Sequence, residues 1–125
     1  MENNGWTFKD IGRVFVRSGI RDEECGSDSW YGWKSPGSNV GGSVSVTFMG
    51  SGTGTLTFGN CWGQDSVDVY FNDSKIASAS VNELKKEVRF EFQERTTLEI
   101  RTEGKGIVKI DSLAISCSGK RFNYL

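Results

Sequence analysis

Apolar and polar residues alternate along much of the chain with a period of two. Over residues 43–48, Val44, Val46 and Phe48 alternate with two serines and a threonine. The same alternation recurs over residues 55–58, 67–71, 88–92 and 98–101. Successive side chains of a strand point to opposite faces, so each run has one apolar face and one polar face. Half-buried strands of this kind are typical of antiparallel sheets that pack face to face.

Short turn signals separate these runs, at residues 50–54, 72–74 and 104–106. Strands at such intervals predict an all-β fold, a two-sheet antiparallel β-sandwich of the jelly-roll type, as a single domain over residues 1–125. The only helical candidate is residues 81–87, which is two turns at most or simply a connection.

Two segments depart from regular alternation. Val108 and Ile110 are even-numbered, whereas Leu113 and Ile115 are odd-numbered, so one extra residue near Asp111 should form a β-bulge. Towards the N-terminus, residues 13–17 read as a strand, and residues 18–39 read as a long polar and aromatic loop. Loops of that length are usually functional or mobile.

Composition narrows the function. The 125 residues contain 15 basic and 16 acidic side chains, so the basic surface expected of a nucleic-acid-binding protein is missing. There is no histidine, which excludes imidazole bases, Ser-His triads and His-ligated zinc sites. We therefore expect a non-enzyme that binds no nucleic acid.

Aromatic residues are the strongest candidates for binding. Trp30, Tyr31 and Trp33 lie within the predicted loop, and Trp62 follows a predicted strand. A flat aromatic face suits the C–H face of a sugar ring, and neighbouring polar groups can bind its hydroxyls. The alternative is that Tyr31 and some of the tryptophans close the ends of the core. The predicted polar ligand-binding residues are Asn60, Gln64 and Asp65.

Asp111 and the cysteines suggest two further features. Asp111 lies at the predicted bulge, where carboxylate and carbonyl oxygens can gather around calcium. Cys61 and Cys117 each follow an alternating run, so the two can meet at strand ends as a disulfide. With Cys25 there are three cysteines, and the alternative is three free or buried thiols.

The location follows from weaker signals. No apolar run is long enough to span a membrane, and residues 1–10 lack the apolar core of a secretion signal. A disulfide, together with the glycosylation sequon at Asn72, would favour an oxidising compartment. We expect an extracellular, secreted protein, and the alternative is a cytosolic one.

Residues 43–117 resemble the galactose-binding-like jelly roll of non-catalytic carbohydrate-binding modules. The residues that carry the resemblance are the strands at 43–48 and 54–58, the V-x-V-x-x-N stretch at 67–72 and the I-D-x-I-x-I-like stretch at 110–115. A structural calcium ion is common in that family, and the resemblance implies that Asp111 is one of its ligands here. It also implies that sugar binds through loop aromatic residues, which in this chain are Trp30, Tyr31, Trp33 and Trp62.

Three functions are compatible with these observations. The leading hypothesis is a lectin-like, non-catalytic module that binds a carbohydrate or glycoconjugate through its aromatic residues. The second is a structural or adhesive extracellular domain that binds another protein or a second copy of itself as a homodimer. The third is a small enzyme that acts on a saccharide through two carboxylates, although no Asp or Glu pair stands out in the pattern.

Overall fold

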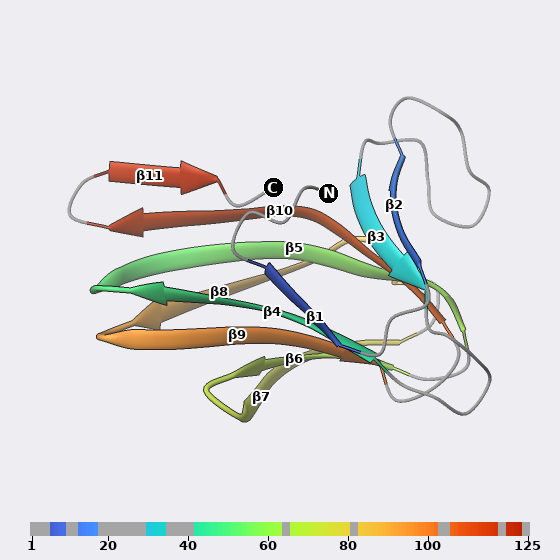
Figure 1. Cartoon of the computed structure of the whole chain (residues 1–125), viewed down its shortest axis with the longest axis horizontal. Helices are drawn as coiled ribbons and strands as arrows, with labels where there is room; N and C mark the ends of the chain where they lie inside the picture. Colours follow the sequence, from blue (N-terminus) through green and yellow to red (C-terminus); the bar gives the residue numbers. More distant parts are fainter. Residues whose placement is uncertain are drawn as a thin grey trace.

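The computed structural model describes residues 6–9, 13–17, 30–34, 42–63, 66–80, 83–102, 106–117 and 120–123 (Figure 1). Its strands are β1 (Trp6–Lys9), β2 (Arg13–Arg17), β3 (Trp30–Lys34), β4 (Gly42–Met49), β5 (Gly52–Gly63), β6 (Val67–Phe71), β7 (Ser74–Ala79), β8 (Lys86–Phe92), β9 (Arg95–Thr102), β10 (Gly106–Cys117) and β11 (Lys120–Asn123).

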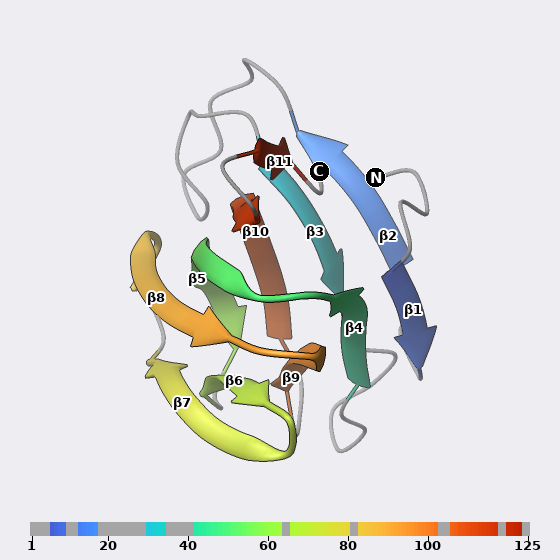
Figure 2. The same cartoon turned by 90° about the vertical axis from the view of Figure 1, so that its left-hand side faces the viewer.

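The strands form two antiparallel sheets. One sheet has the order β1-β4-β9-β6-β7, and the other has the order β2-β3-β10-β5-β8. Strand β11 is the sixth strand of the second sheet and pairs with the end of β10. Figure 2 shows the edge strands β7 and β8 on one side of the molecule and β1 and β2 on the other. The all-β sandwich predicted from the sequence is confirmed.

The core lies between the two sheets and consists of the alternating apolar residues. Leu56, Phe58, Leu98, Ile100 and Ile110 have no exposed surface. At about 25 cal/mol per Å² of buried apolar surface, such side chains contribute roughly 1.5–3 kcal/mol each to folding. Burial of the apolar face therefore explains why these strands take this register and not one shifted by a single residue.

The predicted bulge is confirmed at Asp111. Ile110 pairs with Phe58 of β5, and Ser112 pairs with the next residue, Thr57, so Asp111 has no direct partner on β5. The extra residue lets Ile110 and Leu113 both face the core despite their different parity.

Residues 30–34 were predicted as part of a loop, and that prediction is wrong. They form strand β3, which pairs with β2 on one side and with β10 on the other. The three aromatic residues of the WYGWK sequence suit a strand, and two neighbours supply the backbone hydrogen bonds that a loop would lack. The rest of the predicted loop, with Cys25, lies outside the described residues.

The helical candidate at residues 81–87 contains no helix in its described part. Residues 83–85 have no regular structure, and Lys86 and Glu87 begin β8. Residues 81 and 82 lie outside the description. The alternative reading as a connection fits residues 83–85.

The predicted disulfide between Cys61 and Cys117 is wrong for this fold. Cys117 pairs with Gly52, at the start of β5, whereas Cys61 lies nine residues further along that strand. At about 3.3 Å per residue the two cysteines are roughly 30 Å apart. A disulfide needs Cα atoms within about 7 Å of each other.

Candidate functional site

The four candidate aromatic residues lie on two strands that flank β10. Trp33 pairs with Val108, and Tyr31 pairs with Ile110. On the other side of β10, Trp62 of β5 pairs with Ile107. The sheet thus gathers residues that are far apart in the sequence at one end, because β10 pairs with both strands.

The register divides these positions between the two faces of the sheet. Directly opposed residues of antiparallel strands share a face. Positions 31 and 33 therefore share the face of Ile110, which belongs to the core. Position 30 has the opposite parity, and position 62 shares the face of Ile107 and Lys34. Positions 30 and 62 consequently belong to the outer face of the six-stranded sheet.

Asn60 supports this end of the sheet from inside. Its side chain is 1% exposed, and its Nδ2 donates a hydrogen bond of 3.3 Å to the carbonyl oxygen of Ala79. The bond joins β5 of one sheet to β7 of the other. The prediction that Asn60 contacts a ligand is therefore wrong, since a buried amide is inaccessible. Gln64 and Asp65 lie outside the described residues.

A tight turn precedes β8 next to Asn60. The backbone N–H of Asn60 donates a hydrogen bond of 2.8 Å to the carbonyl oxygen of Glu83. The Glu83 carboxylate accepts hydrogen bonds from the Ser80 hydroxyl at 2.6 Å and the Ser80 N–H at 2.9 Å. Both hydrogen bonds lower the pKa of Glu83 below its ordinary value of 4.5, and the bond from the Ser80 hydroxyl has the larger effect.

Replacing Ser80 by alanine should raise the Glu83 pKa towards 4.5, because the largest cause of its depression is lost. A depressed carboxylate stabilises the fold at pH above its unfolded value, and this contribution disappears as pH falls through the folded value. NMR titration of the Glu83 side chain measures the shift, and Ser78→Ala is the control. An unchanged Glu83 pKa in Ser80→Ala would contradict this account of the turn.

Lys109 and Asp111 form an ion pair at the bulge. The distance from Lys109 Nζ to Asp111 Oδ1 is 3.2 Å, and the side chains are 3% and 10% exposed. Lys109 pairs with Gly59 on one side and with Gly32 on the other, so both strand neighbours lack a side chain. The alternating pattern puts Lys109 on the polar face but gives no sign of its burial.

The described surroundings of Asp111 do not fit a calcium ion. Calcium takes six to eight oxygen ligands, whereas an ammonium lies 3.2 Å from this carboxylate. In the described ranges, no three cysteine or carboxylate side chains cluster as a metal site would require. The Lys109 ammonium supplies the positive charge that calcium would otherwise bring to Asp111.

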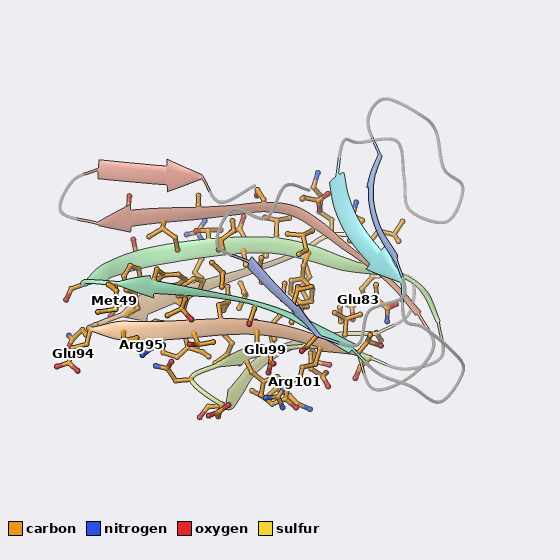
Figure 3. The ribbon with its side chains drawn as sticks, viewed as in Figure 1. Met49, Glu83, Glu94, Arg95, Glu99 and Arg101 are labelled. Carbon is orange, nitrogen blue, oxygen red and sulfur yellow. The ribbon has the colours of Figure 1, made fainter. Side chains whose placement is uncertain are left out.

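The outer face of the five-stranded sheet is occupied by its own interactions. Arg101 stacks 3.8 Å above the Tyr70 ring. It also pairs with Glu99, which lies beside it in Figure 3. Burial acts to lower the pKa of Arg101, but the hydrogen bond and the charge of Glu99, together with Tyr70, raise it above its ordinary value. Thr47 and Thr97 share a hydrogen bond of 3.0 Å. These polar groups therefore form their hydrogen bonds and ion pairs with one another.

No protein-family model and no curated protein matches the sequence. The described part of the chain consists of strands and their connections, and it contains no helix long and apolar enough to cross a membrane.

Solved structures do match. The carbohydrate-binding module TmCBM61, in complex with β-1,4-galactotriose, has a TM-score of 0.55 and 9% identity, over 98% of this chain and 97% of that one. A family 35 carbohydrate-binding module from Clostridium thermocellum has a TM-score of 0.52 and 12% identity, over 90% and 92%. The secreted serine protease VesC from Vibrio cholerae has a TM-score of 0.57 and 7% identity over 86% of this chain.

The chain spans only 25% of the protease chain, whereas it spans almost the whole of the two modules. At these identities the likeness concerns the fold alone. The two-sheet jelly roll of this chain is the fold of carbohydrate-binding modules.

Proposed function

We propose that the protein is a non-catalytic module that recognises carbohydrate at the aromatic end of its six-stranded sheet. The observation that carries the proposal is the register of β3, β10 and β5, which brings positions 30 and 62 to one outer face. Similarity in fold to modules of nearly the same length supports it. An extracellular location remains part of the proposal.

The four aromatic positions have different roles in this proposal. Trp30 and Trp62 are assigned to the ligand, since an aromatic plane can pack against the C–H face of a sugar ring. Tyr31 and Trp33 are assigned to the core, because they share the face of Ile110. The buried Asn60 amide holds β5 against β7 and keeps Trp62 in place relative to β10.

The described charged groups support a binding role over catalysis. Acid–base catalysis needs two carboxylates in different environments. Glu87 pairs with Arg89 at 3.0 Å, and Glu99 pairs with Arg101, each within one strand on an outer face. Each of these carboxylates is held by an arginine of its own strand, an arrangement typical of structural ion pairs and not of an acid–base pair.

Alanine substitutions should separate the two aromatic pairs. Trp30→Ala and Trp62→Ala should weaken saccharide binding by about tenfold or more while the midpoint of thermal unfolding changes little. Tyr31→Ala and Trp33→Ala should lower that midpoint clearly. A glycan array identifies the saccharide, titration calorimetry with that saccharide gives the affinities, and circular dichroism gives the midpoints.

Trp6 supplies a control for the loss of a tryptophan elsewhere, because it lies on β1 of the other sheet, opposite the core residue Val46. Trp6→Ala should leave saccharide affinity unchanged. The proposal is wrong if the array shows no saccharide binding, or if Trp30→Ala and Trp62→Ala bind as the unaltered protein does.

A further inference from the structure

The outer face of β8, β5 and β10 carries a second surface feature, which we call the threonine trough. Its members are Thr53, Thr55 and Thr57 of β5, Glu87, Arg89 and Glu91 of β8, and Ser112, Ala114 and Ser116 of β10. The register aligns them in three rows across the strands, since Glu91 and Ser116 both pair with Thr53, Arg89 and Ala114 with Thr55, and Glu87 and Ser112 with Thr57.

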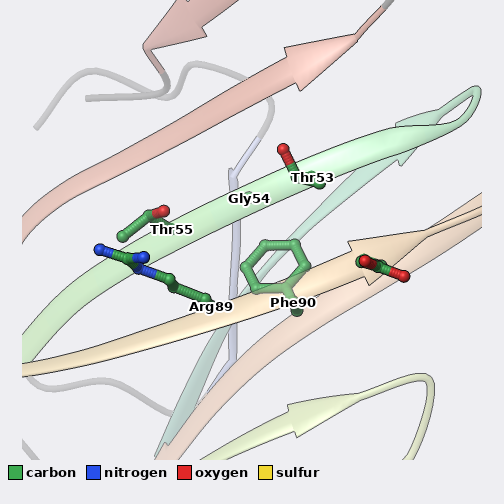
Figure 4. Close-up of a pocket in the computed structure, with 6 residues that line it drawn as sticks. Thr53, Gly54, Thr55, Arg89 and Phe90 are labelled. Carbon is green, nitrogen blue, oxygen red and sulfur yellow. The ribbon is translucent and has the colours of Figure 1, made fainter.

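Side-chain length gives this surface its hollow shape. The two middle strands carry short side chains, while the edge strand β8 carries three long, exposed ones. A hollow of about 500 Å³ lies between Thr53, Thr55, Arg89 and Glu91 (Figure 4). Hollows of about 430 Å³ and 190 Å³ adjoin it, and all three share Thr53. The two larger volumes lie within the range of roughly 300–1,000 Å³ that is typical of ligand sites.

The floor of the trough contains hydrogen-bonding groups that the protein does not use. Among the described residues, Thr53, Thr55, Ser116 and Glu91 have no side-chain hydrogen bond or ion pair. The outer face of the other sheet differs, because its threonines and charges bind one another. Unused donors and acceptors beside a hollow are available to a ligand.

An apolar element lies beneath the hydroxyls. Gly54 lies on the core face of β5 and has no side chain there, so the Phe90 ring packs directly against the Gly54 backbone. The Phe90 ring is also one of the groups that line the hollow. A Cβ atom at Gly54 would come closer than 3.0 Å to the Phe90 ring and to Ile115. Glycine at this position therefore keeps Phe90 beside the hollow, as Figure 4 shows.

The chemistry of the trough favours an uncharged ligand rich in hydroxyl groups. Arg89 is paired with Glu87, so the edge strand offers no free positive charge to a polyanion. The described trough residues include no exposed large apolar side chain of the kind that anchors protein interfaces. Hydroxyl, carboxylate and guanidinium groups around an aromatic edge match the hydroxyls and C–H groups of a sugar.

We propose that the threonine trough is a second saccharide-binding surface, in addition to the aromatic end. This inference rests on the proposed carbohydrate-binding function. Thr53 lies nine residues from Trp62 along β5, or roughly 30 Å, so the hollow around Thr53 is distinct from the Trp62 position, although both lie on the outer face of the same sheet. A single oligosaccharide chain that reaches both would bind more tightly than through either alone.

NMR of the ¹⁵N-labelled full chain, titrated with cellohexaose, β-1,4-galactotriose and the saccharides selected by the glycan array, tests the inference. We expect amide shift changes at Thr53, Thr55, Arg89, Glu91 and Ser116. The double variant Thr53→Val/Thr55→Val removes two floor hydroxyls and keeps β-branched side chains suited to a strand. It should weaken binding at the trough by roughly tenfold, the effect of two lost hydrogen bonds.

The control variant is Thr47→Val/Thr97→Val, which removes two hydroxyls from the other sheet. It should leave the trough shifts unchanged. Shift changes confined to residues 30–34 and 60–63 would overturn the trough and leave the proposed function intact. Shift changes confined to the trough residues would support saccharide binding at the trough and overturn the proposed site at the aromatic end. No shift change with any saccharide would overturn both.

Discussion

Replacing Lys109 by methionine should lower the free energy of unfolding by about 3–5 kcal/mol, the usual cost of breaking a buried ion pair. Lys109 Nζ lies 3.2 Å from Asp111 Oδ1, and both side chains are largely buried. Methionine fills a similar volume but leaves the Asp111 carboxylate buried without this cation. Urea denaturation at neutral pH measures the loss.

Two further variants make the result specific. Lys109→Met/Asp111→Asn removes both charges and should recover much of the lost stability, because the Asp111 carboxylate is no longer buried without Lys109. Lys75 is a matched control, since its Nζ lies 3.6 Å from Asp68 Oδ2 but its side chain is 51% exposed. Lys75→Met should cost less than about 1 kcal/mol. Equal costs for Lys75→Met and Lys109→Met would contradict a special role for the buried pair.

Calcium gives an independent check on the same pair. A ligand that binds only the folded state raises the unfolding midpoint. Since Lys109 already lies against Asp111, any change of the midpoint with calcium should be the same in the unaltered protein and in Asp111→Asn. A midpoint that rises with calcium and is lost in Asp111→Asn would show that calcium displaces the lysine.

Replacing Gly59 by alanine should cost about 2–3 kcal/mol, in the range typical of overpacking. A Cβ atom at Gly59 would come closer than 3.0 Å to three backbone atoms of Leu84. Backbone cannot rotate away as a side chain can, so residues 83–85 must move. That movement should break the hydrogen bond from Asn60 N–H to the Glu83 carbonyl.

The local consequence of Gly59→Ala can be measured apart from stability. The pKa of Glu83 should rise towards its ordinary value of 4.5 if the turn with Ser80 is distorted. Thr57→Ala changes the same face of β5 two residues away and should leave this pKa unchanged. An alanine at position 59 that neither destabilises the fold nor moves the Glu83 pKa would refute the close approach of Leu84.

Regular alternation predicted the long strands well. Val44, Val46 and Phe48 are buried, and polar residues between them are partly or fully exposed. The parity change between Ile110 and Leu113 located the bulge at Asp111, because the apolar face must remain on the core through both halves of the strand.

Short strands were harder to predict. Strand β7 has little alternation, and it forms because Asn72 and Asp73, with φ angles of 45° and 68°, make a tight hairpin turn that returns it to β6. Strand β3 was predicted as a loop, because it becomes a strand only by pairing with its neighbours β2 and β10. One of these neighbours, β10, lies more than 70 residues further along the sequence.

Local periodicity alone specifies which face of each long strand is buried and where one strand must carry an extra residue. Which distant residues meet depends on how the strands pair in the folded protein. The register of β5 and β10 separates Cys61 from Cys117, makes Lys109 a buried partner of Asp111 and lines up the rows of the threonine trough. Pairing between strands depends on contacts across the whole chain, and no local pattern specifies it.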